Sequence, residues 1–439
     1  MGSELRNAVI AGKVADVESL CRRLKVGPGG LLDEPEPESS TAEHAFFFDV
    51  KGQTALHLAA NYGHEAIVKI LLEKCAGTTL DHYGRQPAHL AAENGHFECL
   101  KLLLAPPTGK RLLMLQRHQA EQGQAREKNG AEVTTSTTAG ASPLQTVDPN
   151  VRERVCGKTM LHLSAVSGYA SQIALLLSLE GIKVNKQEMT GCTALHYACG
   201  EGHADCVEAL LAHTDIDVSL KEYIFGQTAL QKACGGGHAN CVRLLLDQSA
   251  AGKDVNVTDE EFGRTALHWA AQNNSPGAVE CLRLLLAATP LPADTRRVDV
   301  FGRSALIYAA MCGNTVAVQL LLDASAHPVG GAAGAADAGS GPDAGAPSIG
   351  GADAGAGLET VDADAEKKAA ANHQDREGMT SLLHAAQLNC HDVLRLLLEN
   401  PLVDRTIANL DGDTIHTIRH RDDTTKAIIA QLCAQPGVW

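Results

Sequence analysis

The chain has 439 residues, of which 44% are hydrophobic, 20% charged and only 3% aromatic, and its formal net charge is −15. This acidic balance argues against nucleic acid as a partner, because phosphates are bound by an excess of Lys and Arg, and against an anionic membrane surface. A chain this apolar with so few rings must fill its interior with small and aliphatic side chains. Thin, stacked helical layers do that better than a thick globular core.

Features of targeting and redox state point to one kind of environment. No run of 18 apolar residues appears, so we expect no membrane span. The first six residues, Met1 to Arg6, contain neither an apolar signal core nor a myristoylation signal. The 13 cysteines are an odd number in a long chain, and we expect reduced thiols that pack as small hydrophobes. We therefore predict a protein of the cytoplasm or the nucleus.

The chain is built from copies of one short sequence motif, which we call the repeated word. Residues 1–26 have the apolar spacing of a helix pair, and residues 27–48 form an acidic stretch rich in Pro and Gly. The word first appears as GQTALHLAA at residues 52–60, followed by Gly-His and an aliphatic run. Its copies differ in detail but keep the leading glycine, at Gly52, Gly84, Gly157, Gly191, Gly226, Gly263, Gly302, Gly378 and a worn ninth at Gly412. Most steps are close to a period of about 33 residues, and two long steps contain insertions.

Each position in the word has a physical explanation. The leading glycine allows the chain to reverse, and the threonine two residues later accepts hydrogen bonds from the first turn of a helix. The Leu and Ala positions face inward, and the Gly-His pair separates the first helix from a second, Leu-rich one. A single copy cannot bury its apolar face alone, so neighbouring copies must stack.

This word resembles the ankyrin repeat. The resemblance implies an all-α solenoid of stacked helix-turn-helix units joined by short, hairpin-like turns, with about nine repeats after an N-terminal capping helix pair. We therefore divide the chain into the cap (1–26), the acidic loop (27–48), repeats 1–2 (49–104), a largely flexible insertion (105–155) that includes a candidate helix over 110–128, repeats 3–7 (156–326), a Gly/Ala/Asp-rich disordered insertion (327–371), and repeats 8–9 with a polar C-terminal cap (372–439).

Two local motifs resemble chemical sites but are explained by the repeat. Residues 157–159 read Gly-Lys-Thr, but a phosphate-binding loop needs a further glycine where Arg152 stands. Cys199, His203 and Cys206 have the ligand types of zinc, and the fifth repeat contains the same spacing. Three ligands leave a tetrahedral shell incomplete, and other repeats place Cys or His in the same register. We expect no metal and no cofactor.

A histidine recurs three residues after the capping position in five copies, at His57, His89, His162, His196 and His268, and that position is Thr in four of them and Gln86 before His89. A catalytic histidine needs a matched nucleophile or acid, whereas a periodic one is better explained as a structural hydrogen-bonding group. No known catalytic motif follows a suitable strand pattern. We predict that the chain is not an enzyme.

Partners of proteins with this resemblance usually bind the concave face, formed by the turn tips and the exposed side of the first helices. Three successive tips carry Phe before the glycine, and Arg often follows it. Both residue types are common at interface hot spots. The candidate protein-binding residues are Lys51, Tyr62, Tyr83, Arg85, Glu93, Asn94, Glu201, Phe225, Phe262, Arg264, Gln272, Asn273, Phe301 and Arg303. The alternative, which the sequence leaves open, is that the Phe rings only pack on neighbouring turns.

The preferred function is a non-enzymatic scaffold or adaptor, expected to be monomeric, that binds other proteins through this face. The arginines at the tips favour an acidic partner segment. One alternative is a recruitment or inhibitory subunit of a larger enzyme complex. Another is a metal- or redox-responsive protein that uses the Cys- and His-rich repeats 4 and 5.

Overall fold

The computed structural model describes residues 2–23, 25–26, 32–33, 51–74, 79–106, 147–247, 254–288, 292–324, 363–419 and 421–433. The chain divides into two compact units, which are described separately. Unit 1 comprises residues 1–233 and 240–252, and unit 2 comprises residues 234–239 and 253–439. Most of the acidic loop, the candidate helix over 110–128 and most of the insertion expected at 327–371 lie outside the described residues.

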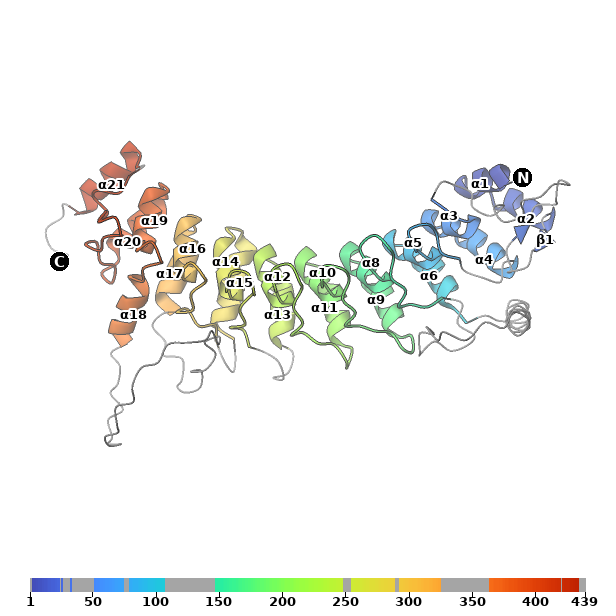
Figure 1. Cartoon of the computed structure of the whole chain (residues 1–439), viewed down its shortest axis with the longest axis horizontal. Coiled ribbons are helices and arrows are strands. Elements are labelled where there is room, and N and C mark those ends of the chain that lie inside the picture. Colours follow the sequence, from blue (N-terminus) through green and yellow to red (C-terminus); the bar gives the residue numbers. More distant parts are fainter. Residues whose placement is uncertain are drawn as a thin grey trace, which may run out of the picture. The chain divides into compact units, whose positions relative to one another are not determined.

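Unit 1 consists of helix pairs in series (Figure 1). It begins with α1 (Gly2–Ile10) and α2 (Val14–Arg23), and then a short antiparallel pair of strands, β1 (Lys25–Val26) and β2 (Leu32–Asp33). The next pairs are α3 (Ala55–Tyr62) with α4 (Glu65–Lys74), α5 (Pro87–Glu93) with α6 (Phe97–Leu104), α8 (Met160–Ser167) with α9 (Ala170–Leu177), and α10 (Ala194–Glu201) with α11 (Ala204–Leu211). First helices pack on first helices, and second on second. The pair α12 (Ala229–Gly236) and α13 (Ala239–Asp247) contains residues of both units.

Unit 2 repeats this plan. Its pairs are α14 (Ala266–Gln272) with α15 (Pro276–Leu286), α16 (Ala305–Met311) with α17 (Thr315–Ala324), and α19 (Ser381–Gln387) with α20 (His391–Glu399). Helix α18 (Ala363–Ala371) packs on α17, and α21 (Asp423–Cys433) packs on α20. The predicted all-α arrangement of stacked helix pairs is therefore confirmed in both units. No helix of the described segments has the length and apolar character that crossing a membrane requires.

Helix α10 shows why the repeated word folds in this way. The Thr193 side chain accepts a hydrogen bond from the His196 N–H at the start of the helix, and Gly202 ends it in the left-handed region at φ 79°. Between them, Leu195, Ala198 and Cys199 are at most 1% exposed. Small residues on this face let the neighbouring first helices approach closely, and the Leu-rich second helices fill the space between layers.

The insertions do not interrupt the stacking. Helix α5 packs directly on α8, although residues 107–146 lie between them in sequence, and α16 packs on α19 across residues 325–362. The C-terminal end of the second insertion was predicted to be disordered, and this is wrong for residues 363–371, which form α18. Ala, Glu and Lys in this stretch are strong helix formers. Ala371 at the end of α18 is buried, and α18 packs on α17.

The ninth copy differs from the others in its first helix. After Gly412 and Thr414, residues 415–417 form only a turn, and the next helix is α21. Charged residues of this copy replace some apolar residues of the repeated word, so this copy has less apolar surface to bury against its neighbours. Ile415 and Ile418 still turn inward and are at most 4% exposed. This terminal copy therefore closes the stack of unit 2 rather than extending it.

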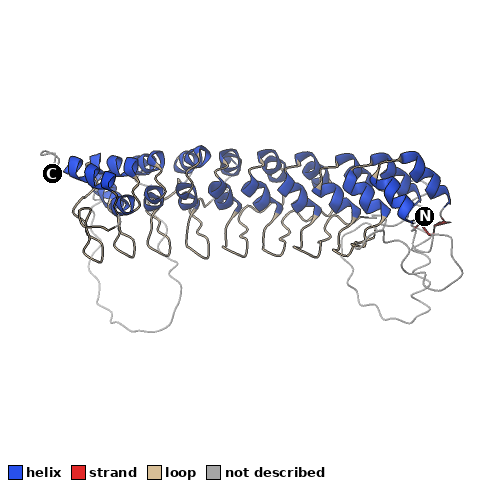
Figure 2. Ribbon diagram, turned by 90° about the horizontal axis from the view of Figure 1, so that it is seen from above, coloured by secondary structure: helices blue, strands red, loops and turns tan. Residues whose placement is uncertain are grey.

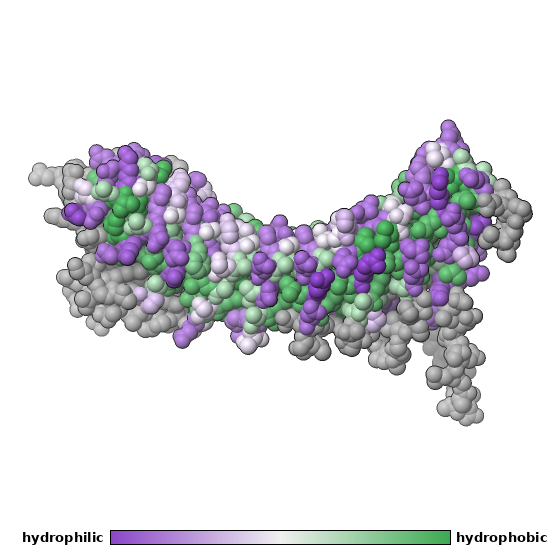
Figure 3. All heavy atoms as spheres, turned by 180° about the vertical axis from the view of Figure 1, so that it is seen from behind, coloured by the Kyte–Doolittle hydropathy of each residue, from purple (hydrophilic) through white to green (hydrophobic). Residues whose placement is uncertain are grey.

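Between successive helix pairs the chain turns back in a hairpin-like loop. Figure 2 shows these loops projecting on one side of the helix pairs. The side seen in Figure 3 has hydrophilic and hydrophobic residues intermixed rather than one large apolar patch. Scattered apolar surface residues are usual on soluble proteins and do not by themselves mark a site.

Candidate functional site

The repeated histidine fixes the base of each hairpin. In repeat 3, His162 Nδ1 accepts a hydrogen bond from the Thr159 backbone N–H at 3.2 Å, so the ring proton lies on Nε2. His162 Nε2 donates to the Cys192 carbonyl of the next repeat at 3.1 Å. The same two contacts recur in the other copies, at His57, His89, His196 and His268. These histidines tie each repeat to the next, which confirms the structural role predicted for them.

Burial keeps these imidazoles neutral. It lowers the pKa of His89, His162, His196 and His268 from 6.5 to about 4, because the charged form is disfavoured away from water. In repeat 5, where Gln231 replaces the histidine, Oε1 of that side chain accepts the Thr228 N–H at 2.7 Å. The third residue after the capping position therefore supplies a hydrogen-bond acceptor rather than an acid or a base.

Sequence reasoning missed a second repeated group, the buried acids of the hairpins. An Asp or Glu stands three or four residues before the repeat glycine, at Asp81, Glu153, Glu188, Glu222, Asp259, Asp299 and Asp375, and each is at most 8% exposed. Its carboxylate accepts hydrogen bonds from backbone N–H groups of the tip, as Asp299 does from Phe301 and Arg303 at 2.9 Å. Against the cost of burial, such hydrogen bonds hold the pKa of Glu188 below its usual range. The recurrence of an acid at this spacing was the available signal.

A backbone ladder joins neighbouring tips. In unit 1, the Met189 N–H donates to the Cys156 carbonyl at 2.9 Å. In unit 2, the Val300 N–H donates to the Phe262 carbonyl at 2.8 Å, and the Arg376 N–H to the Phe301 carbonyl at 3.0 Å. The residue before each repeat glycine is therefore placed at a fixed register along one edge within each unit.

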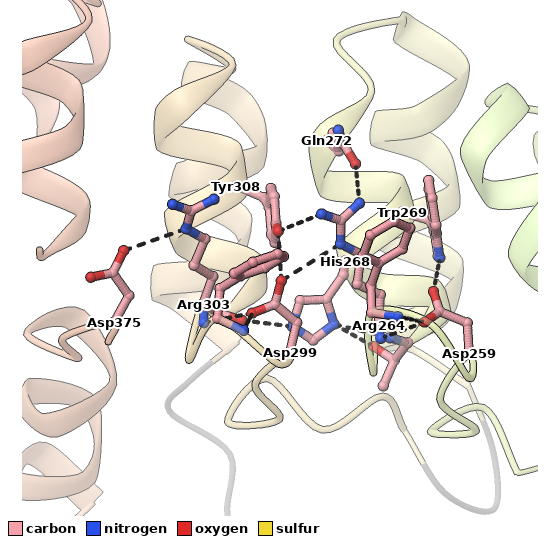
Figure 4. Close-up of polar contacts among 12 residues, drawn as sticks. Asp259, Arg264, His268, Trp269, Gln272, Asp299, Arg303, Tyr308 and Asp375 are labelled. Carbon is pink, nitrogen blue, oxygen red and sulfur yellow. Dashed lines mark hydrogen bonds and ion pairs between the residues drawn. The ribbon is translucent and has the colours of Figure 1, made fainter. Parts of the chain in front are cut away.

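The tips of repeats 6 and 7, in unit 2, form a cluster around Arg264 (Figure 4). The Arg264 guanidinium donates to the Tyr308 hydroxyl at 2.7 Å and to Gln272 Oε1 at 3.2 Å. It also lies over the rings of Phe262 and Trp269, at 4.6 and 5.2 Å from their centroids. The arginine side chain is only 11% exposed. Arg264 thus binds the hairpin to two first helices.

Arg303 extends this cluster to the eighth repeat. Its Nε lies 3.4 Å from Asp375 Oδ2, and its guanidinium lies 5.3 Å from the Phe301 ring centroid. The Asp375 carboxylate also accepts a hydrogen bond from His384 Nε2 at 2.8 Å. Phe301, packed against Arg303 on one side, remains 43% exposed on the other. One edge therefore contains five of the predicted residues, namely Phe262, Arg264, Gln272, Phe301 and Arg303. Its two arginines contact Tyr308 and Asp375 of the protein itself.

Comparison with known proteins agrees with this geometry. A family model described as "Ankyrin repeats (3 copies)" matches residues 10–112, 137–222 and 213–294, and a model of the single ankyrin repeat matches residues 301–329. The chain belongs to the ankyrin repeat family.

Curated relatives share this repeat region with the chain. Inversin of Gallus gallus is 34% identical over 37% of the chain, Rabankyrin-5 of Mus musculus 30% identical over 39%, and the Nuclear factor NF-kappa-B p105 subunit of Gallus gallus 32% identical over 39%. The matched stretches make up only 14%, 14% and 17% of those proteins. The chain therefore matches less than a fifth of the length of each of these relatives. Ankyrin repeats are generally protein-protein interaction modules and are typically non-catalytic.

A second group of predicted residues lines a cavity of about 420 Å³ in unit 1, between the N-terminal helices and the first two ankyrin repeats. The predicted members are Lys51, Tyr62, Arg85, Glu93 and Asn94, and α1 contributes Arg6 and Ile10. Arg85 is held by the buried carboxylate of Asp81, with Nη2 to Oδ2 at 2.9 Å, and lies 3.6 Å from Glu93. Tyr83, 38% exposed, stands beside the cavity with the Arg85 guanidinium over its ring at 5.0 Å.

Three predicted residues remain. Phe225 and Glu201 belong to unit 1, which is described separately from the Phe262 and Phe301 edge of unit 2. Asn273 is used internally, because its Nδ2 donates to the Gly235 carbonyl at 2.7 Å and its Oδ1 accepts the Ser275 N–H. Asn273 therefore shapes the turn between α14 and α15 rather than the edge.

The cysteines and histidines of ankyrin repeats 4 and 5 serve packing where the structure shows their contacts. His203 Nε2 donates to the Val166 carbonyl at 3.1 Å, and burial raises the pKa of Cys206 to about 11 and raises that of Cys199 well above its usual value. Across the described ranges, no group of three His, Cys, Asp or Glu side chains is placed to hold a metal ion. The Gly157-Lys158-Thr159 stretch forms a turn and helix cap, as predicted, with Gly157 at φ 78°.

Proposed function

We propose that the chain is a non-enzymatic scaffold or adaptor that binds partner proteins through its hairpin edge and the adjoining first helices. The observation that carries this proposal is the edge formed by Phe262 and Phe301 in unit 2. Both rings stand at the register that the backbone ladder fixes, and Phe301 is 43% exposed. Aromatic side chains in such positions are typical anchors of protein interfaces.

The cluster beneath the edge supports binding because it fixes the rings in advance. Arg264 and Arg303 are packed against Phe262 and Phe301, and each arginine is held by an acid or hydroxyl of a neighbouring repeat. A surface that is already ordered loses little conformational entropy when a partner binds. The arginines thus act as supports, and the Phe rings are the expected contacts. This differs from the sequence-based expectation that the arginines themselves bind an acidic partner segment.

The cavity of unit 1 is the second part of the proposed surface. Its walls come from the first helices α1, α3 and α5, and Tyr62 on α3 is 46% exposed. Polar groups of the cavity, including Asn61, Asn94 and Glu93, offer hydrogen bonds, and Ile10, which is 37% exposed, offers apolar contact. Such a mixture suits a side chain or a short loop of a partner protein.

The proposal is tested by quantitative affinity capture from cell lysate. We expect the double variant Phe262→Ala, Phe301→Ala to lose a specific partner that the wild type retains. The matched control is Val316→Ala, because Val316 is 46% exposed on the second helix α17, away from the hairpins. Equal thermal melting curves for all three proteins would show that the loss is not an effect of unfolding. Retention of every partner by the double variant would contradict the edge as the binding site.

A further inference from the structure

The hairpins of ankyrin repeats 3 to 5, in unit 1, present a second set of exposed apolar side chains. Val155, Met189, Tyr223 and Ile224 are 60%, 66%, 66% and 57% exposed. Val155, Met189 and Ile224 each stand two residues before the repeat glycine of their copy, and Tyr223 stands three residues before it. We call these four residues the apolar stripe. The candidate list drawn from the sequence omitted all of them, because it followed the residue immediately before the glycine.

The backbone ladder makes the stripe continuous. The Met189 N–H donates to the Cys156 carbonyl at 2.9 Å, and the Tyr223 N–H donates to the Thr190 carbonyl at 2.8 Å. The Tyr223 hydroxyl donates to Gln187 Oε1 of the preceding hairpin at 2.9 Å, which holds its ring along the edge. Large apolar side chains that are exposed in three successive hairpins form a row rather than scattered single residues.

At the tips of these hairpins the acidic side chains are buried and the basic side chains are not. The acids Glu153, Glu188 and Glu222 point inward and are at most 8% exposed. Their carboxylates accept hydrogen bonds from backbone N–H groups of the tips. The basic side chains of the same hairpins are Arg152, Arg154, Lys158, Lys186 and Lys221, and none of them is buried. The chain as a whole carries a net charge of −15, so a basic rim here runs against the overall balance.

Local contacts keep part of this basic rim in place. Lys158 Nζ lies 4.7 Å from the centroid of the Tyr197 ring, and Lys186 Nζ donates to the Asn150 carbonyl at 2.6 Å. Neither of these two contacts is an ion pair with a carboxylate. The surface therefore combines a central row of apolar side chains with a positively charged border.

We infer that the apolar stripe docks an extended segment of a partner protein in which apolar and acidic side chains alternate. Apolar side chains of the segment cover the stripe, and its carboxylates face the basic rim, where ion pairs favour one orientation and speed association. In an extended segment the acidic side chains between the apolar ones point away from the stripe, and the long Lys and Arg side chains that border the segment pair with them from its sides. The inference rests on the proposed scaffold function and adds the chemistry of one partner and a surface distinct from the Phe262 and Phe301 edge.

A defined probe tests this chemistry directly. Fluorescence anisotropy of the full chain would be measured with a labelled twelve-residue peptide of alternating Leu and Glu, and with a matched peptide of alternating Leu and Lys. We expect saturable binding of the Leu/Glu peptide that weakens as NaCl is raised, and at least tenfold weaker binding of the Leu/Lys peptide. Absence of binding by the Leu/Glu peptide, or equal binding of both peptides, would overturn the inference.

Variants locate the binding. We expect the double variant Met189→Ser, Ile224→Ser to bind the Leu/Glu peptide at least tenfold more weakly than wild type. The control Val14→Ser changes a residue of α2 that is 39% exposed, and it should bind as wild type does. An equal loss in the control, or full binding by the double variant, would contradict the stripe as the site. Far-UV circular dichroism would check that each variant remains folded.

The failure of this inference is distinguishable from failure of the proposed function. The lysate capture depends on Phe262 and Phe301 in unit 2, whereas the peptide titration depends on residues of unit 1. If the wild type captures partners from lysate but does not bind the Leu/Glu peptide, the scaffold function stands and the stripe is not a docking site for an acidic segment.

Discussion

Arg264 donates a hydrogen bond of 2.7 Å to the Tyr308 hydroxyl, and that hydroxyl donates in turn to Asp299 Oδ2 at 2.6 Å. The chain of contacts links the hairpin of repeat 6 to the first helix and hairpin of repeat 7. Burial, followed by the bond to Asp299, raises the pKa of Tyr308 to about 12, so the hydroxyl keeps its proton at neutral pH. One phenol thus serves as acceptor for the arginine and donor for the buried acid beneath the proposed binding edge.

Removal of this hydroxyl is expected to destabilise unit 2. The variant Tyr308→Phe leaves Asp299, which is 5% exposed, without one of its hydrogen-bond donors. The expected loss is about 1–3 kcal/mol in the free energy of unfolding, the usual cost of unpairing a buried polar group. Urea denaturation followed by circular dichroism measures it. Tyr62→Phe is the control, because Tyr62 is 46% exposed and its substitution should change stability by less than about 0.5 kcal/mol.

Acid is expected to destabilise the stack through the buried histidines. Their pKa is about 4 in the folded chain and 6.5 ordinarily, so between these values the unfolded chain binds protons that the folded chain does not. Stability is therefore complete above about pH 6.5 and falls as the pH drops towards 4. At pH 5 each such histidine contributes a loss of about 2 kcal/mol. The urea midpoint at pH 7 and at pH 5 measures the effect.

A single substitution tests the assignment to these histidines. His162→Gln imitates repeat 5, in which Gln231 accepts the hydrogen bond of Thr228. We expect this variant to show a smaller fall in urea midpoint between pH 7 and pH 5 than the wild type, because one titrating group is gone. An unchanged pH dependence would show that His162 does not control the acid response.

The repeated word predicted the histidines well because their role is local and periodic. Thr159 and His162 are three positions apart in one helix turn, and the pattern recurs in other copies. The same periodicity predicted the stacking of helix pairs across the insertions. The network of Arg264, Tyr308 and Asp299 could not be predicted from it, because Arg264 and Tyr308 are 44 positions apart and meet only after the repeats stack.

The exposed surface was harder to predict for a related reason. The hairpins place the acid either three or four residues before the glycine, as Asp299 and Asp259 illustrate, so the tip residues shift by one position between copies. A rule based on the residue just before the glycine therefore found Phe301 but missed Met189 and Ile224. The side chain of Asn273 also closes a turn between helices, which a periodic pattern does not reveal.

Two glycines of repeat 4 should respond oppositely to alanine. Gly191 has φ 82°, and a Cβ there would lie 2.6 Å from the Tyr223 backbone N, which takes part in the ladder between tips. Gly191→Ala should therefore cost more than the roughly 1–2 kcal/mol of a left-handed residue alone. Gly200 lies within α10 with open space around the added Cβ, so Gly200→Ala should be neutral or stabilise by up to about 1 kcal/mol. Thermal melting of both variants checks the contrast.

Thiol labelling separates structural cysteines from reactive ones. Cys156 is exposed at a hairpin tip, whereas Cys199 is fully buried and burial raises its pKa well above the usual value. A thiol that is both protonated and covered reacts slowly. We expect iodoacetamide to modify Cys156 in the folded chain, and Cys199 only in denaturant, as read by peptide mass spectrometry. Rapid modification of Cys199 in the folded chain would favour the redox-responsive alternative.

Site-specific photo-crosslinking tests the central claim, that partner proteins bind the hairpin edge. A photoreactive phenylalanine analogue would replace Phe301 in one protein and Val316 on α17 in another, both at positions of similar exposure. The account predicts a discrete crosslinked partner from position 301 and none from position 316. Crosslinks from position 316 alone, or none from position 301 while the wild type still captures a partner, would contradict it.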